Sequence, residues 1–161
     1  MQNAFIALGS NLQQPEQQIL QAFSEIKSLP KTRLVKCSSL YRTAPVGYDN
    51  QPDFINAVVE VQTDLTPREL LRALLAVENK HGRERPFPNA PRVLDLDLLL
   101  YGNMVMTTDE LTLPHPRMHE RGFVLLPLAE IAPTLQLTRY GKVSELAKTH
   151  LAQGVEKLAA N

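Results

Sequence analysis

A chain of 161 residues has the usual size of one compact domain and buries roughly two thirds of its unfolded surface. Its 17 basic and 17 acidic residues cancel, so no overall field would attract nucleic acid or an anionic membrane. We therefore expect a single domain over residues 1–161 with neither of these partners, and any anion-binding site should be local.

The sequence also bears on the cellular compartment. Cys37 is the only cysteine, so no intrachain disulfide can form, and its strand-like surroundings predict a small core residue. The first ten residues have no basic segment, and the apolar run 4–8 is too short for a signal peptide or a membrane span. Both features are consistent with a cytoplasmic protein.

The first 63 residues predict strands around one helix. Residues 3–9 form a short apolar run typical of a buried strand, and apolar side chains recur at helical spacing over 15–28. Residues 33–43 and 54–63 are rich in β-branched side chains and alternate, which predicts two further strands.

A second helix follows with clear boundary signals. Thr66, Pro67 and Glu69 are the residue types preferred at an N-cap, at the first helical position and at N3. Gly82 is a natural stop for the helix that they begin. A proline-rich loop then leads away from it.

The last part of the chain predicts one strand and two helices. Residues 93–101 predict the strand, and Gly102-Asn103 predicts a hairpin turn into residues 104–106. Residues 121–131 and 144–152 predict the helices. The order strand, helix, strand, strand, helix, strand up to residue 101 is that of the α+β, ferredoxin-like βαββαβ core. In this fold helices cover one face of an antiparallel sheet, and we expect long catalytic loops.

The strongest chemical signal is a pair of aspartates in a leucine-rich strand. Period-two alternation places Leu94, Leu96, Leu98 and Leu100 on one face and Asp95 and Asp97 on the other. The aspartate Cα atoms would lie roughly 6.5–7 Å apart, and such a pair could bridge two hard cations about 3.5–4 Å apart. Many Asp-x-Asp pairs merely decorate a solvated face. Here a metal is favoured, because aspartate is a poor strand former and like charges on one face repel.

Between His81 and Gly141 the chain has arginine but no lysine. The arginines are Arg83, Arg85, Arg92, Arg117, Arg121 and Arg139. Each alone is typical of a surface charge, but grouped around the aspartates their planar guanidinium groups favour a polyphosphate clamp. His115, held between two prolines, could bind a phosphate or could equally be a structural loop histidine. No P-loop motif and no zinc-ligand spacing occur.

Five segments then occur in a recognisable order. They are Gly9-Ser10-Asn11-Leu12, Ser39-Leu40-Tyr41-Arg42-Thr43-Ala44-Pro45, Gln51-Pro52-Asp53-Phe54-Ile55-Asn56, Pro91-Arg92-Val93-Leu94-Asp95-Leu96-Asp97, and Leu113-Pro114-His115-Pro116-Arg117 with Arg121-Gly122-Phe123. Together they resemble the 6-hydroxymethyl-7,8-dihydropterin pyrophosphokinase family over about residues 4–135. Taken without the others, the first segment is typical of a plain strand-to-helix turn.

The resemblance implies an ATP-dependent diphosphotransferase of tetrahydrofolate biosynthesis. The β,γ-diphosphate of ATP would move to the hydroxymethyl group of the pterin and release AMP, and we expect a monomer that acts on these two small molecules. The resemblance implies that Asp95 and Asp97 hold two Mg²⁺ ions, and that Arg83, Arg92 and Asp97 are catalytic. The implied ATP contacts are Glu78, Arg85, Leu98, Thr112, His115 and Arg121. The implied pterin contacts are Thr43, Pro45, Val46, Phe54, Asn56 and Phe123.

The segment 88–92 departs from the family pattern. It reads Pro-Asn-Ala-Pro-Arg, whereas family members often carry a tryptophan before Gly-Pro-Arg, and this chain has no tryptophan. The additional prolines stiffen the segment. The resemblance at the metal and phosphate positions is unaffected.

Two alternatives remain open from the residues alone. A different metal-dependent phosphotransferase or a nuclease could use the same aspartate pair, although zero net charge disfavours the nuclease. A non-catalytic ferredoxin-like module that binds a small ligand or a protein would not need both aspartates. Metal binding in the presence of nucleotide distinguishes this module from an enzyme.

Overall fold

The computed structural model describes residues 1–44, 50–82, 93–150 and 154–158. The first part of the chain contains β1 (Gln2–Ser10), α1 (Pro15–Lys27), β2 (Thr32–Cys37), β3 (Tyr41–Thr43), β4 (Phe54–Thr63), α2 (Pro67–Lys80) and β5 (Asp95–Tyr101). The second part contains β6 (Met106–Thr107), β7 (Thr112–Leu113), η1 (Met118–Glu120), α3 (Gly122–Ile131), β8 (Gln136–Leu137), β9 (Gly141–Lys142), α4 (Val143–Thr149) and β10 (Glu156–Lys157). No helix in the described ranges is long and apolar enough to cross a membrane.

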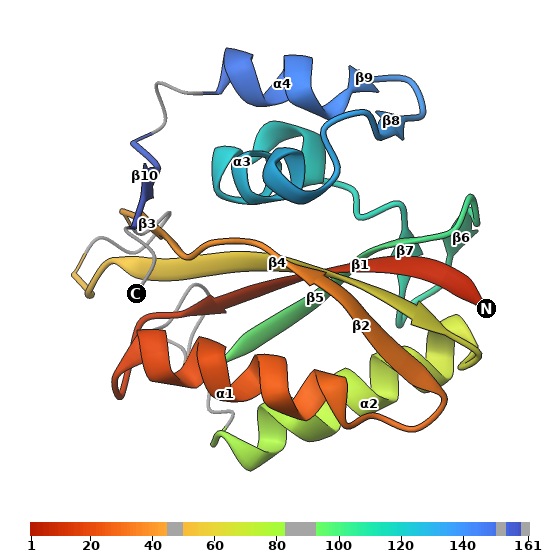
Figure 1. Cartoon of the computed structure of the whole chain (residues 1–161), viewed down its shortest axis with the longest axis horizontal. Coiled ribbons are helices and arrows are strands. Elements are labelled where there is room, and N and C mark those ends of the chain that lie inside the picture. The colour runs from red at the N-terminus through yellow and green to blue at the C-terminus, as the bar shows by residue number, and fades with distance from the viewer. Residues whose placement is uncertain (45–49, 83–92, 151–153, 159–161) are drawn as a thin grey trace.

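Six of the described strands form an antiparallel sheet in the order β10-β3-β4-β1-β5, with β2 also paired to β4 (Figure 1). The pairs β6-β7 and β8-β9 form two separate two-stranded sheets. The central strand β1 pairs with β4 from Gln2 opposite Thr63 to Ser10 opposite Ile55. On its other side β1 pairs with β5. The end of β1 therefore lies between the beginnings of β4 and β5. The predicted α+β, ferredoxin-like fold is confirmed.

Alternation along the strands separates two hydrophobic cores. Ile6, Leu8 and Val59 belong to the core between the sheet and the two helices α1 and α2. Phe5 and Val58 point the other way, into a second core formed with α3 and α4. Figure 1 shows these two later helices on the opposite face of the sheet from α1 and α2. The sheet is therefore covered on both faces, so the expectation that helices cover one face holds only for α1 and α2 and is wrong for the whole chain, because α3 and α4 bury the second face.

One extra residue in β5 changes which leucines share a face. Phe5 pairs with Leu100 and Ile6 pairs with Leu98, so Leu99 is an extra residue at this point in the ladder. Such a bulge interrupts strict alternation. Leu94, Leu96 and Leu98 lie in the α1/α2 core as predicted, but Leu100 packs against the α3/α4 core, so its predicted face was wrong.

Two further strand predictions were wrong in part. The predicted strand 33–43 is divided into β2 and β3, because the Ser38 hydroxyl accepts the Val58 N–H at 2.9 Å in place of a backbone carbonyl. Gly102 makes the predicted turn, but no hairpin with β5 follows, since β6 pairs with β7. Cys37, expected in the core, is exposed at the end of β2.

The start of α2 has the predicted capping box. The Thr66 hydroxyl accepts the Glu69 N–H at 3.2 Å, and the Glu69 carboxylate accepts the Thr66 N–H at 2.9 Å. The hydrogen bonds from the Thr66 backbone and side chain lower the pKa of Glu69. A carboxylate with a lowered folded pKa stabilises the fold above its unfolded pKa, and this is lost as the pH falls through the folded value.

Thr66→Ala removes the N-cap hydroxyl and should lower the free energy of unfolding at pH 7 by about 1 kcal/mol, the usual cost of losing such a cap. The difference from the natural chain should shrink on acidification through the pKa range of Glu69, and urea unfolding at several pH values measures it. Thr66→Ser retains a capping hydroxyl and serves as the control. Equal stability of the alanine variant and the natural chain at pH 7 would contradict the assigned cap.

Candidate active site

The strand register brings Asp95, Gly9 and Asn56 into one row across β5, β1 and β4. Asp97 lies in the next row, opposite Ala7. Directly paired residues of an antiparallel ladder point to the same face, and here that face is the one covered by α3. The half-buried carboxylates of Asp95 and Asp97 thus share a surface with the side chain of Asn56.

Gly9, which has no side chain, lies in the middle of this row. A Cβ atom at this position would lie 3.3 Å from Asn56 Oδ1 and 3.8 Å from Phe54 Cδ1. A glycine inside a strand often marks a place where a ligand or another group approaches the backbone closely. The sequence predicted a turn at Gly9 and not this close approach to Asn56 and Phe54, although a glycine that ends an apolar strand was the available signal.

Asn56 is buried with its amide nitrogen unsatisfied. The side chain is 5% exposed, and Nδ2 has no hydrogen-bond partner among the described residues. Buried polar atoms are nearly always hydrogen-bonded, because leaving one unpaired costs roughly 1–3 kcal/mol. An unpaired donor beside Gly9 and the half-buried Phe54 is suited to an acceptor atom on a flat ligand.

His115 is held as a neutral imidazole. Its backbone N–H donates to Leu99 O at 2.9 Å, and its Nδ1 accepts the Arg117 N–H at 3.2 Å, which leaves the proton on Nε2. Burial, followed by the positive charge of Arg121, lowers the pKa of His115 to about 4, although Asp95 acts in the opposite direction. The Nε2–H is therefore a hydrogen-bond donor at neutral pH.

Thr43, Phe123 and Arg121 border the same face. Thr43 ends β3 opposite Phe54 and is buried. Phe123 lies in the first turn of α3 and packs against the α3/α4 core. The Arg121 guanidinium carbon lies 5.6 Å from the centre of the Phe123 ring, a cation–π distance. An aromatic wall and a permanent positive charge thus lie close together.

The remaining expected residues fall into two groups. Glu78 is 2% exposed on α2 and accepts the Leu96 N–H at 2.6 Å. The Leu98 side chain is buried in the α1/α2 core, so it could reach a ligand on the aspartate face only through its backbone, while Thr112 is half-buried in β7. The residues Pro45, Val46, Arg83, Arg85 and Arg92 lie outside the described residues.

A polar cluster around Glu130 on α3 was not predicted from the sequence. Its carboxylate accepts the Ser39 N–H at 2.9 Å, the Ser39 hydroxyl at 2.7 Å and the Tyr41 hydroxyl at 2.8 Å. Burial alone would raise the pKa of Glu130, but these hydrogen bonds and Lys157 more than offset it and leave the pKa lowered. The cluster ties α3 to β3, the strand that carries Thr43.

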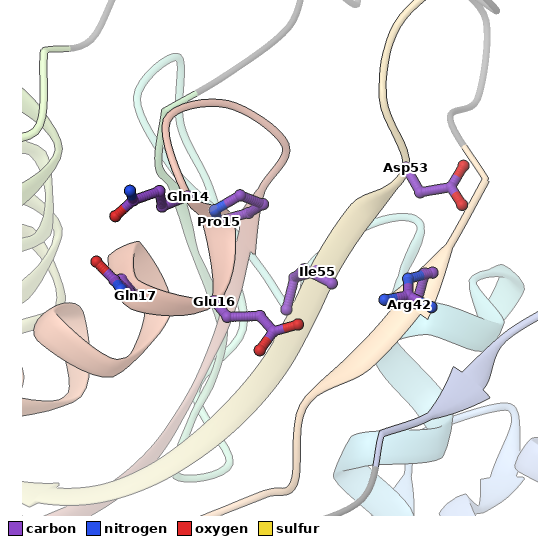
Figure 2. A pocket seen from close by; sticks show the side chains of 7 residues that line it. All are labelled: Gln14, Pro15, Glu16, Gln17, Arg42, Asp53 and Ile55. Atoms are coloured by element: carbon purple, nitrogen blue, oxygen red, sulfur yellow. The ribbon is translucent and has the colours of Figure 1, made fainter.

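A pocket lies on the other side of the sheet from the aspartates. Figure 2 shows the side chains of Glu16 from α1, Arg42 from β3 and Ile55 from β4 around it, and Ile55 belongs to the α1/α2 core. None of the residues expected from the sequence lines this pocket. The Arg42 guanidinium lies 3.9 Å from the carboxylate of Glu156, a structural ion pair.

The donor set fits magnesium held together with phosphate. Within the described ranges no group of three or more His, Cys, Asp or Glu side chains could hold a metal alone. Asp95 and Asp97 supply hard carboxylate oxygens, and Mg²⁺ is usually bound by one or two carboxylates with water and substrate phosphate completing the shell. The aspartate pair therefore suits metal that arrives with a polyphosphate.

Comparison with known proteins identifies the family. Residues 5–133 match the family described as 7,8-dihydro-6-hydroxymethylpterin-pyrophosphokinase (HPPK). The chain belongs to this family. A 2-amino-4-hydroxy-6-hydroxymethyldihydropteridine pyrophosphokinase of Haemophilus influenzae is 46% identical over 148 residues, 92% of each chain. The protein of the same name from Pseudomonas aeruginosa is 43% identical over 158 residues, 98% of each chain.

A solved structure shows the same fold. A crystal structure of an HPPK-DHPS protein in complex with substrates matches with a TM-score of 0.76 at 13% identity, over 99% of this chain and 47% of that chain. The chain thus spans about half the length of that protein, and the likeness concerns the fold alone. As a family member, the chain is a pyrophosphokinase, a diphosphate-transferring enzyme of folate biosynthesis.

Proposed function

We propose that the chain transfers the β,γ-diphosphate of ATP to the hydroxymethyl group of 6-hydroxymethyl-7,8-dihydropterin, giving the pterin diphosphate and AMP on the path to tetrahydrofolate. The observation that carries the proposal is the row Asp95, Gly9, Asn56. In it a carboxylate and an unsatisfied amide donor lie on either side of a glycine that has no side chain. Two strand spacings separate Asp95 from Asn56, roughly 10 Å. A bicyclic ring at Asn56 can thus present its substituent toward the aspartates.

The pterin would lie between aromatic walls. Phe54 and Phe123 supply ring faces, and a flat heterocycle gains dispersion energy when it is stacked on aromatic groups. Asn56 Nδ2–H donates to an acceptor on the ring edge, and Thr43 lies at the end of the neighbouring strand. The expected edge contacts from Pro45 and Val46 belong to the same proposal.

The ATP side rests on the carboxylates and the basic groups. When bound, two Mg²⁺ ions would neutralise phosphate charge and lower the pKa of the attacking hydroxyl. Asp95 and Asp97 would hold these ions beside the phosphates. Neutral His115 donates its Nε2–H to a phosphate oxygen. Arg121 adds a permanent charge, and Arg83 and Arg92 complete the clamp as catalytic residues.

The further ATP contacts proposed are Glu78, Arg85, Thr112 and the backbone of Leu98. Glu78 lies on α2, and its carboxylate reaches the beginning of β5, where it accepts the Leu96 N–H. We infer a cytoplasmic monomer with one domain over residues 1–161, acting on small molecules without nucleic acid. Size-exclusion chromatography with light scattering tests the oligomeric state, and a dimer would overturn this part.

The central experiment measures AMP released from ATP and Mg²⁺, with and without the pterin, for the natural chain and for Asp95→Ala. Pterin-dependent AMP release that disappears in the variant would support both the reaction and the metal site. AMP or ADP release that does not depend on the pterin would point to another acceptor. The family match favours the pterin over that alternative.

Gly9→Ala should raise the KM for the pterin about tenfold, because its Cβ would lie 3.3 Å from Asn56 Oδ1 and narrow the gap. The KM for ATP should change much less. Steady-state kinetics with each substrate varied in turn measures both values. Ala7→Gly, one row away on the same strand, is the matched control, and an unchanged pterin KM in Gly9→Ala would contradict the proposed binding surface.

A further inference from the structure

Two consecutive buried side chains at the end of β1 form hydrogen bonds, one toward the start of β5 and the other toward the start of β4. Ser10 is 0% exposed, and its hydroxyl donates to Val93 O at 2.5 Å. Asn11 is 1% exposed, and its Nδ2 donates to Gln51 Oε1 at 2.7 Å and to Pro52 O at 3.1 Å. Neither residue has a role in the reaction described above.

Two of these three hydrogen bonds, to Val93 O and to Pro52 O, hold backbone that lies outside the strand ladders. The ladder between β1 and β4 ends at Ser10 opposite Ile55, and the ladder between β1 and β5 ends at Gly9 opposite Asp95. Pro52 and Val93 lie beyond these last pairs, each two residues before a site residue of its strand, Phe54 or Asp95. Side-chain donors from the last residue of β1 and from the residue after it therefore replace the missing ladder bonds at these two points.

We propose that Ser10 and Asn11 are positioning residues that hold the two halves of the active site in register. Asn11 holds the start of β4, which carries the pterin-side residues Phe54 and Asn56, and Ser10 holds the start of β5, which carries Asp95 and Asp97. The inference rests on the proposed function. A small misplacement of reacting groups lowers the rate steeply, about a hundredfold for 1 Å.

The two residues should affect different kinetic constants. Asn11→Ala should raise the KM for the pterin about tenfold and leave the KM for ATP within about twofold. Ser10→Ala should lower kcat about tenfold with little change in the pterin KM, because it loosens the aspartates. Ser10→Cys replaces the hydroxyl by a larger and weaker S–H donor, so its kcat should lie between those of Ser10→Ala and the natural chain.

Amide hydrogen exchange gives a readout that does not depend on activity. Exchange should become faster near residues 53–55 in Asn11→Ala and near residues 94–96 in Ser10→Ala, with both variants folded by circular dichroism. Thr63→Val is the matched control: it removes another fully buried hydroxyl, at the opposite end of β4, and should leave the kinetic constants unchanged.

The outcomes separate this inference from the proposed function. If the natural chain shows no pterin-dependent AMP release, the proposed function fails. If the natural chain is active, equal effects of both variants on both KM values, or the same pattern in Thr63→Val, would overturn the positioning role. Should Ser10→Ala not fold, the graded effect of Ser10→Cys decides the matter, and an unaltered kcat in that variant counts against the inference.

Discussion

Asp97→Ala should lower the kcat for pterin diphosphate formation by roughly a thousandfold or more, while the protein remains folded. Asp97 shares the α3 face of β5 with Asp95. Loss of one of the two carboxylates weakens metal binding, so the negative charge of the phosphates is no longer neutralised. Stability should change by less than about 1 kcal/mol, since the side chain is half-buried and two like charges on one face repel.

AMP release under saturating ATP, pterin and Mg²⁺ measures the effect on kcat, and thermal unfolding measures stability. Asp97→Asn distinguishes the effect of the lost negative charge from the effect of lost side-chain volume, because it removes the charge and keeps the volume. Asp109→Ala, at an exposed turn position, is the control and should have normal activity. Near-normal activity of Asp97→Ala would remove the basis for the metal assignment.

The parts of the fold that sequence predicts are those with local causes. The limits of β4, Phe54–Thr63, coincide with the predicted strand because the segment is rich in β-branched side chains and turn residues flank it. The cap at Thr66 depends on three residues within one turn of helix. By contrast, the division of 33–43 into β2 and β3 depends on a hydrogen bond between Ser38 and Val58, twenty residues apart.

The candidate site divides in the same way. Period two alone places Asp95 and Asp97 on one face, and the structure agrees. The position of Gly9 between Asp95 and Asn56 depends on the register of three strands, which no single segment encodes. The bulge at Leu99 likewise appears only when β5 is paired with β1, and it moves Leu100 to the other core.

The contacts made by Glu130 and by Asn11 show a related limit. Each joins segments far apart in the chain, Ser39 to α3 in one case and the end of β1 to Pro52 in the other. In sequence each is an ordinary polar residue near an element end. Only the fold shows that both contacts brace strands that carry site residues.

Asn56→Ala should lower kcat/KM for the pterin about a hundredfold, mostly through KM. The amide can make two hydrogen bonds to a ring edge, and at about 1–1.5 kcal/mol each they correspond to that factor. The free energy of unfolding should change by less than about 1 kcal/mol. The lost packing is opposed by the removal of a buried donor that has no partner among the described residues.

This combination of a large functional loss with a small change in stability distinguishes a binding residue from a core residue. A buried group retained only for packing would lose stability on truncation and leave substrate affinity unchanged, whereas a donor kept unsatisfied in the free protein lowers stability until its ligand binds. Addition of the pterin should accordingly raise the melting temperature of the natural chain more than that of Asn56→Ala. Asn79→Ala, an exposed asparagine on α2, is the control. Equal pterin-induced shifts in the natural chain and in Asn56→Ala would place the pterin elsewhere.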